Sequence, residues 1–384
     1  MSSQGHDLSR HFITITDPRL ERQKAHSLID IIMVAICAVI AGCEGWVEIA
    51  DFGEDKEPWL KTFLALPNGI PSHDTFGRVF SLLDPRQFQE SFAGWMRSVV
   101  TLTNGEVIAI DGKTNRHTFG GKGGTRALHL VSAFATANGV ALGQVATDQK
   151  SNEITAIPEL LKLLDIKGCL VTTDAMGCQA DIAPEILEKG ADYLLAVKGN
   201  QGLLYRDMKT VFADTSTSRD TNVSENTGHG RIERRTCEVM SGPEVIARLR
   251  HKNNWVGLAT IVKVTSVRTV QPKVGTAAYK QNKPATSVES RYYICSVENP
   301  SAEQMQQAVR AHWKVENSLH WVLDMQMRED ESRIRTDNAP ANMAVLRHIA
   351  LNIVRSDETR KIGVKASRLK AGRNDAYLKK LLGF

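Results

Sequence analysis

The stretch Glu106-Val-Ile-Ala-Ile-Asp111-Gly-Lys113 is an apolar run that ends in a carboxylate, a glycine and a cation. Its aliphatic residues predict a short buried strand over residues 106–111, which would hold Asp111 at the rim of a sheet. Open α/β folds bind ligands and ions at the carboxyl ends of their strands. We expect Gly112 to turn the chain away and Lys113 to meet an anion. The alternative is an ordinary turn aspartate that accepts hydrogen bonds from nearby backbone N–H groups.

The elements after this strand predict a mixed sheet rather than a plain dinucleotide-binding unit. A Gly-rich basic loop, residues 113–126, leads into two strands that Asn138-Gly139 would join as a hairpin. A helix, a strand, a second helix and a further strand follow. No GxGxxG follows the first strand, so dinucleotide binding loses support. This order is the one found in ribonuclease-H-like sheets; the predicted elements are strands 106–111, 128–135, 140–147, 169–171 and 191–197 and helices 153–164 and 179–189.

The residues before the first strand have helical periodicity. Residues 1–12 are predicted to be a disordered tail, and residues 13–103 to form a helical N-terminal domain. Two short helices, 72–83 and 87–100, are separated by Asp84-Pro85 and could form a helix-turn-helix that reads DNA. The alternative is a plain helical bundle. Residues 44–74 hold seven acidic residues and two lysines, which suits a bundle better than a phosphate-binding surface.

The catalytic domain is predicted to span residues 104–354, with a β-rich insertion at about 203–300. Residues 227–300 contain twelve Lys or Arg against five Asp or Glu, which fits either a polyanion-binding surface or a solvated subdomain. Ser301 and Gln304 form a capping-box pattern at the start of a long helix. The basic tail, residues 355–384, is expected on the surface or against DNA.

Composition is ordinary for a folded protein, with a formal net charge of +5 and 42% hydrophobic residues. The six cysteines form no CxxC pair, so neither a zinc ribbon nor a redox motif is indicated, and a reducing cytoplasm fits best. The most apolar run, residues 28–43, carries Asp30 and is too short for a membrane span. We therefore expect a cytoplasmic protein with no membrane partner.

A second strand also ends in an aspartate, Asp174. In the proposed sheet the first and fourth strands are neighbours, so Asp111 and Asp174 would meet. Two close carboxylates repel unless a proton or cation lies between them, and oxygen ligands favour Mg²⁺ or Mn²⁺ over zinc. Glu316 is the best third carboxylate for a site with two ions, which would activate a water or a 3′-hydroxyl for attack on a phosphodiester. Second-choice acids are Asp324, Glu329, Asp330 and Glu331.

Two further hypotheses concern the polar helix around Glu316. His312, Glu316 and His320 are spaced i, i+4, i+8, so one helical face could form a zinc ridge, although the HExxH spacing of zinc proteases is absent. Several residues could contact DNA phosphates, with solvated surface polarity as the alternative. The predicted DNA-binding residues are Lys113, Lys198, Asn200, Arg310 and Lys314.

These motifs together resemble the H-repeat-associated DDE transposases of bacterial insertion sequences, which are linked to Rhs elements. The resemblance is carried by Ala109-Ile-Asp111-Gly-Lys113, Thr173-Asp174-Ala-Met-Gly177, Ala196-Val-Lys198-Gly-Asn200-Gln201, His312-Trp313-Lys314-Val-Glu316-Asn317-Ser-Leu-His320-Trp321, Arg328-Glu329-Asp330 and Leu346-Arg347-His348-Ile-Ala350-Leu-Asn352. It implies an RNase-H-like core with Asp111, Asp174 and Glu316 as catalytic, metal-binding residues. The implied reaction is cleavage at element ends followed by transfer of the 3′-hydroxyl into target DNA. Because two ends of double-stranded DNA must be joined, we expect a homodimer on DNA.

One departure concerns the residues around Glu316. Related transposases carry Arg four positions before the catalytic Glu and Lys seven after it, whereas this chain has His312 and Leu323. Arg310 or Lys314 would then take over the phosphate contacts. The alternative function is a catalytically inactive, DNA-binding remnant of a transposase, and a third is a general nuclease that cuts without joining.

Overall fold

The computed structural model describes residues 8–118, 127–147, 153–228, 230–270, 275, 285–357, 359 and 362–383. The chain divides into two compact units that do not follow its linear order. The first unit comprises Met1–Leu102, Asp111–Asp165 and Lys314–Phe384, and the second comprises Thr103–Ile110 and Ile166–Trp313. The domain limits inferred from the sequence remain predictions.

The helical part of the first unit is built around α2 (Leu28–Ala41), whose residues 30–40 are all buried. The Ser27 side chain caps this helix by accepting a hydrogen bond from the Asp30 N–H. The predicted break at Asp84-Pro85 is confirmed, because α4 ends at Leu82 and α5 begins at Pro85. The other helices of this part are α1 (Leu8–Phe12), α3 (Trp46–Leu60), α4 (His73–Leu82), α5 (Pro85–Val99), α13 (Ala339–Arg355), α14 (Val364–Arg373) and α15 (Asp375–Leu382).

Both ends of the chain are more ordered than the sequence predicted. Residues 8–12 of the expected disordered tail form α1, which buries Leu8 and Phe12; residues 1–7 lie outside the described residues. The basic C-terminal tail was expected on the surface or against DNA. Its α14 and α15 instead bury Ala371 and Leu378 and pack with α2 and α13. The prediction rested on the net positive charge of the tail and did not take into account the apolar face that these helices also carry.

The first unit also contains a hairpin beside the second half of β1 (Val107–Asn115). Strands β2 (Leu128–Ala135) and β3 (Val140–Thr147) pair antiparallel, and Gly139 turns the chain at a φ of 72°. This confirms the hairpin predicted from Asn138-Gly139. Helix α6 (Glu153–Leu163) packs on it. The strand order in this unit is β3-β2-β1. The residues of the predicted basic loop from 119 to 126 lie outside the described residues.

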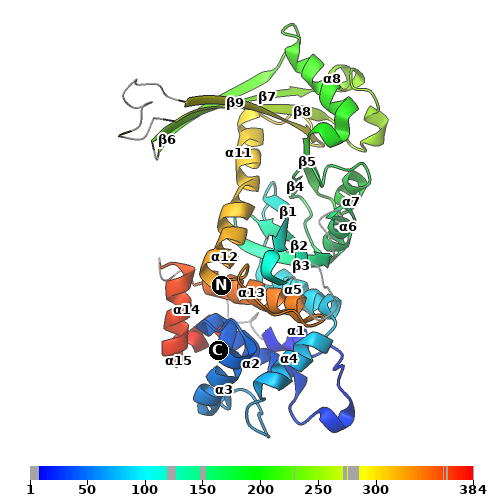
Figure 1. Cartoon of the computed structure of the whole chain (residues 1–384). Helices are drawn as coiled ribbons and strands as arrows, with labels where there is room; N and C mark the ends of the chain where they lie inside the picture. Colours follow the sequence, from blue (N-terminus) through cyan, green and yellow to red (C-terminus); the bar gives the residue numbers. More distant parts are fainter. Residues whose placement is uncertain are drawn as a thin grey trace. The chain divides into compact units, whose positions relative to one another are not determined.

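The second unit holds a mixed sheet in the order β1-β4-β5-β9-β8-β7-β6, to which β1 contributes residues 107–110 (Figure 1). Its parallel part pairs β1 with β4 (Leu170–Thr173) and β4 with β5 (Asp192–Val197). A meander followed by two parallel strands is the arrangement predicted, so the RNase-H-like α/β class is confirmed. The remaining strands are β6 (Asp220–Gly228), β7 (Arg231–Ser241), β8 (Thr260–Val270) and β9 (Ala285–Cys295).

Two helices cover opposite faces of the insertion strands, as Figure 1 shows. Met305 of α11 (Ala302–His312) joins a buried cluster with Cys237 and Val262, whereas Phe212 of α8 (Gly202–Ala213) packs on Tyr292 from the other side. The capping box of Ser301 and Gln304 is confirmed. Neither α8 nor β6 was predicted; β6 is a polar, largely exposed edge strand without apolar alternation. The smaller helices are α7 (Ile182–Glu188), α9 (Pro243–Ala247), η1 (Glu21–Gln23), η2 (Arg116–Thr118), η4 (Gly199–Gln201) and η5 (Lys252–Asn254).

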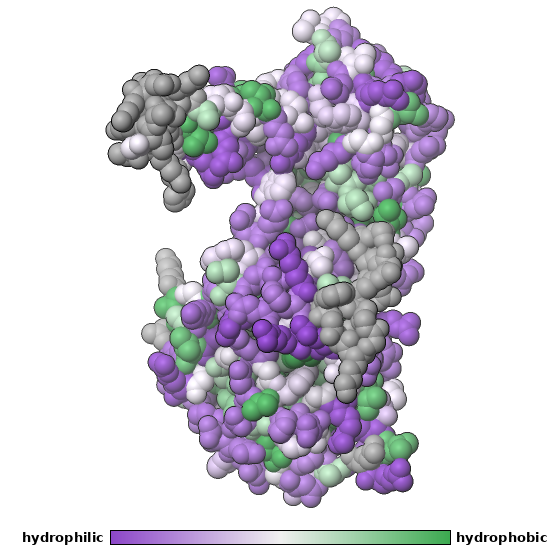
Figure 2. Space-filling model, in the orientation of Figure 1, coloured by the Kyte–Doolittle hydropathy of each residue, from purple (hydrophilic) through white to green (hydrophobic). Residues whose placement is uncertain are grey.

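No single helix among the described residues is long and apolar enough to cross a membrane. The bent pair α2 and α3 passes that test jointly, by length and composition only, and α2 is a buried core helix. The face shown in Figure 2 is mainly hydrophilic, with hydrophobic residues in small separate groups.

Candidate active site

Strand β1 runs past Asp111 to Asn115, so Gly112 does not turn the chain as predicted. Side chains alternate along a strand, which places Asp111 and Lys113 on one face and Gly112 on the other. The Asp111 Oδ2 atom lies 3.5 Å from Nδ1 of His320. Burial lowers the pKa of His320 to about 3, so its ring is neutral at physiological pH.

A glycine is required at position 112 because other side chains approach its backbone closely, and not because the chain turns there. A Cβ atom at this position would lie 2.5 Å from Glu153 Oε1 and 2.7 Å from His129 Nε2. His129 Nε2 lies 2.8 Å from Glu153 Oε1 in a buried contact, and His129 Nδ1 lies 2.8 Å from Thr114 Oγ1. Sequence reasoning missed this pair, because no local pattern links a strand histidine to the first residue of α6.

Asp174 directly follows β4 and is held by its own loop. Its Oδ1 accepts hydrogen bonds from the N–H groups of Met176 at 2.8 Å and Gly177 at 3.2 Å. In the described parts of the chain, hydrogen bonds to this carboxylate reach only Oδ1. The Asn200 Nδ2 atom donates to the Ala175 carbonyl at 2.6 Å, which braces the same loop from the end of β5.

The parallel register relates the two aspartates. It runs from Val107 opposite Leu170 to Ile110 opposite Thr173. Asp111 and Asp174 are therefore the next residues after the last matched pair of two neighbouring parallel strands. This is the register that the sequence analysis required for the two strands.

Glu316 lies in a π-helical turn, η6 (Val315–His320), between α11 and α12 (Trp321–Met327). Such turns are uncommon and occur frequently at functional sites. The turn buries Val315 and Leu319 and leaves Glu316 exposed. It also breaks the regular i, i+4, i+8 spacing on which the zinc ridge depended.

The two histidines of that ridge have separate partners. His312 Nδ1 lies 2.9 Å from Thr172 Oγ1, and burial lowers the pKa of His312 to about 4, whereas His320 faces Asp111. Within the described ranges, no group of three or more His, Cys, Asp or Glu side chains is arranged to hold a metal ion, and this applies to Asp111, Asp174 and Glu316 as well as to the ridge. The zinc-ridge hypothesis is therefore abandoned.

The four second-choice acids also have other partners. Glu329 and Asp324 both accept hydrogen bonds from Lys113 Nζ, at 2.7 Å in the case of Glu329. Asp330 Oδ1 accepts from the Arg116 N–H at 3.0 Å, and Glu331 pairs with Arg328. Burial raises the pKa of Glu329, but the charges of Lys113 and Arg347 outweigh it and lower that pKa to about 2.

The predicted DNA-binding residues differ in their environments. Lys198 and Arg310 are exposed, and exposed Lys314 donates to the Thr136 carbonyl at 3.3 Å. Asn200 braces the Asp174 loop, as described above. Lys113 is only 11% exposed, and the anions that it meets are two carboxylates of this chain.

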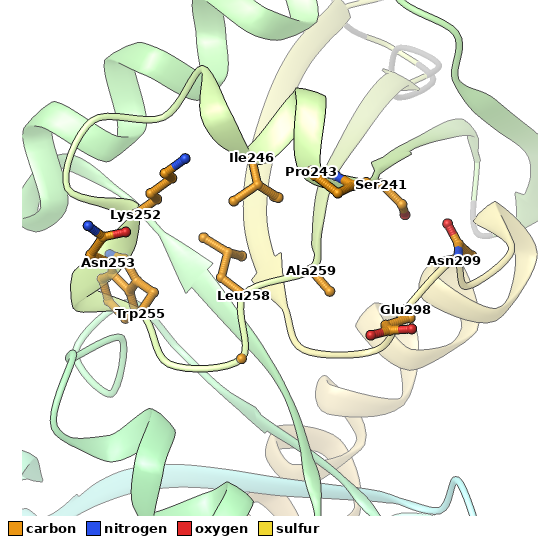
Figure 3. A pocket seen from close by; sticks show the side chains of 12 residues that line it. Ser241, Pro243, Ile246, Lys252, Asn253, Trp255, Leu258, Ala259, Glu298 and Asn299 are labelled. Carbon is orange, nitrogen blue, oxygen red and sulfur yellow. The ribbon is translucent and has the colours of Figure 1, made fainter.

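A cavity of about 600 Å³ lies elsewhere in the second unit (Figure 3). Ile246, Leu258 and Trp255 contribute apolar surface to it, and Glu298 and Asn299 stand at one side. It contains none of the residues predicted to form the active site.

The protein has a mixed α/β fold, with two aspartates directly after matched parallel strands and a glutamate-bearing helix after a β-rich insertion. These features describe a DDE-type nucleic-acid-processing domain. The transposase DDE domain family matches residues 103–353, and the DDE_Tnp_1-associated family matches residues 9–96. The chain therefore belongs to the family of transposases with a DDE domain, and its resemblance to H-repeat-associated members is confirmed.

The similar proteins include near full-length relatives. "H repeat-associated putative transposase YhhI" of Escherichia coli (strain K12) is 42% identical over 98% of this chain and 97% of its own. "Putative transposase YncI" of Escherichia coli O157:H7 is 44% identical over 96% of this chain and 92% of its own. A solved piggyBac transposase synaptic complex with hairpin DNA gives a TM-score of 0.45 at 12% identity, over 98% of this chain and 80% of that one; this likeness is too weak to assign a fold.

Proposed function

We propose that this protein is an active transposase that cuts double-stranded DNA at the ends of an insertion-sequence-like element and transfers the 3′-hydroxyl into target DNA. The observation that carries the proposal is the register of β1 and β4, with Ile110 opposite Thr173. Asp111 and Asp174 each follow that pair directly. Membership of the DDE family adds the reaction class.

The proposed catalytic residues are Asp111, Asp174 and Glu316. All three offer carboxylate oxygens, the donor type that suits Mg²⁺ or Mn²⁺. The hydrogen bonds to Asp174 reach its Oδ1 atom and leave Oδ2 for a cation. The ring of His320 beside Asp111 is neutral and adds no positive charge there. Asp111 and Glu316 belong to the first unit and Asp174 to the second, so the assembly of the three around two ions is part of the proposal.

Bound ions would supply an activated water or 3′-hydroxyl and stabilise the leaving oxygen. The chain's own contribution is to hold the carboxylates on rigid elements and to bind the DNA backbone. We assign the phosphate contacts to the exposed cations Lys198, Arg310 and Lys314. Lys113 is left out of this set because two carboxylates hold it, and Asn200 because its amide donates to the Ala175 carbonyl and it carries no charge. A homodimer would hold two element ends together, and the six free thiols fit the cytoplasm.

The test uses purified protein and a plasmid that carries the element with its flanking DNA, in Mg²⁺ or Mn²⁺. Sequencing of 3′ ends and joined products should show cuts at the element borders and target joining. Asp111→Ala and Asp174→Ala should abolish both, whereas Glu331→Gln, which alters an exposed carboxylate paired with Arg328, should leave both intact.

Other results would assign a different function. Binding of the element ends without cutting in either metal would identify an inactive remnant. Cutting without joined products would identify a nuclease. A single protomer on a joined pair of ends, measured by sedimentation, would exclude the proposed dimer.

A further inference from the structure

Lys113 leaves β1 on the same face as Asp111, because side chains two residues apart on a strand point the same way. Its ammonium is nevertheless held by other carboxylates. Nζ donates to Glu329 Oε2 at 2.7 Å and to Asp324 Oδ1. The Glu329 side chain is 0% exposed and that of Lys113 is 11% exposed. This is a buried ion cluster beside a proposed metal ligand.

The backbone fixes Glu329 in this position. Arg328 adopts a left-handed conformation, with a φ of 49°, at the end of α12. The Glu329 N–H then donates to the Leu323 carbonyl at 3.0 Å, a bond that closes the helix end. The next residue, Asp330, accepts a hydrogen bond from the Arg116 N–H at 3.0 Å. The segment after α12 is thus attached at two points beyond Asp111, to Lys113 of β1 and to Arg116 of η2.

The cluster matters because Lys113 is the nearest cation to Asp111 along the chain. An ammonium without its own carboxylates would turn toward any neighbouring negative charge, since leaving a buried charge uncompensated is costly. An ammonium beside Asp111 would compete with a metal cation for the same oxygen atoms. Glu329 and Asp324 supply two negative charges that hold the Lys113 ammonium.

We propose that Glu329 and Asp324 hold the Lys113 ammonium away from Asp111 and thereby preserve the affinity of the candidate active site for divalent cations. They are positioning residues, not metal ligands, and the inference rests on the proposed function. Lys113 also has a structural role in this arrangement, because its hydrogen bonds connect β1 to the segment that follows the Glu316 helix. Each residue of Arg328-Glu329-Asp330 then has a structural role. Arg328 ends α12, Glu329 pairs with the Lys113 ammonium, and Asp330 accepts a hydrogen bond from the Arg116 N–H.

The test measures Mn²⁺ binding to the full-length protein by electron paramagnetic resonance, with Asp111→Ala as the baseline for sites elsewhere. Glu329→Gln should weaken Asp111-dependent binding about tenfold, because it leaves Lys113 under-compensated. The double variant Lys113→Met/Glu329→Gln should restore binding to within about threefold of wild type, since the competing cation is gone. Glu331→Gln is the matched control and should bind as wild type. If Glu329→Gln does not fold, Asp324→Asn and its double with Lys113→Met provide the same comparison at a half-buried position.

A merely structural role would make the double variant bind no better than Glu329→Gln, and that result would overturn the inference. Wild-type affinity in Glu329→Gln would do the same while leaving the proposed function intact. Absence of Asp111-dependent Mn²⁺ binding in the wild type would instead remove the metal site itself, and the inference with it.

Discussion

Thr172 Oγ1 and His312 Nδ1 lie 2.9 Å apart, a contact that joins the strand leading to Asp174 to the last residue of α11. The side chain of His312 is half-buried, and its ring is nearly perpendicular to that of Trp313. Four positions before Glu316, where the resemblance to related transposases implied an arginine, this chain therefore has a neutral side chain that packs and makes one hydrogen bond.

We expect this histidine to make stability depend on pH. Burial lowers the pKa of His312 to about 4, from an ordinary histidine pKa of 6.5. Between pH 6.5 and pH 4 the imidazole of His312 is protonated in the unfolded chain but not in the folded one. The free energy of unfolding is therefore highest above about pH 6.5 and falls as the pH drops toward 4. His312→Gln should reduce the loss of unfolding free energy between pH 7.5 and pH 5 by about 1–2 kcal/mol.

Urea denaturation at the two pH values measures the difference. The same measurement on His73→Gln, which replaces an exposed histidine, is the comparison. An equal pH dependence in wild type and His312→Gln would contradict a neutral His312.

Gly112→Ala should destabilise the first unit. The new methyl group would lie 2.5 Å from Glu153 Oε1, and the contact of Glu153 with buried His129 leaves little room to move. Overpacking of this kind costs about 1–3 kcal/mol. Differential scanning calorimetry should show a lower Tm for Gly112→Ala. Gly202→Ala, at a position with nothing within 4 Å of the added atom, should be neutral or slightly stabilising, and equal effects in the two variants would refute the steric explanation.

The sequence was sufficient to predict the elements that local chemistry determines. The apolar run before Asp111, the Asn138-Gly139 turn and the Ser301 capping box each specify their structure within a few residues, and each is confirmed. The strand limits were less certain, because residues 112–115 continue β1 without an apolar pattern.

The environment of the candidate site could not be predicted in the same way. Lys113 was expected to meet an anion and to contact DNA phosphates; the anions that hold it, Asp324 and Glu329, come from a distant part of the chain. The same holds for Glu153 and His129. Long-range ion pairs leave no signal in one sequence, because each charged residue alone is compatible with a solvated surface. The polar edge strand β6 was missed for a related reason: it is specified by its pairing with β7 and has little burial of its own.

Asn200→Ala should reduce DNA cleavage without weakening DNA binding. The Asn200 amide donates to the Ala175 carbonyl and so stabilises the loop that carries Asp174. Loss of one such hydrogen bond is worth about 1 kcal/mol, or roughly a fivefold change in the population of the competent loop. Single-turnover cleavage at saturating protein, combined with filter binding, separates the two effects. A fall in DNA affinity with unchanged cleavage of bound DNA would instead support the phosphate contact predicted from the sequence.

The salt dependence of DNA binding should distinguish surface cations from buried ones. Each phosphate contact made by Lys198 or Arg310 releases about one counterion, so Lys198→Gln and Arg310→Gln should each lower the slope of log affinity against log salt by about 1. Lys162→Gln, which removes an exposed lysine paired with Glu159, is the surface control and should keep the wild-type slope. The double variant Lys113→Met/Glu329→Gln removes a buried pair of opposite charges and should also keep it. A reduced slope in that double variant, with Lys198→Gln unchanged, would show that Lys113 reaches DNA despite its two carboxylate partners.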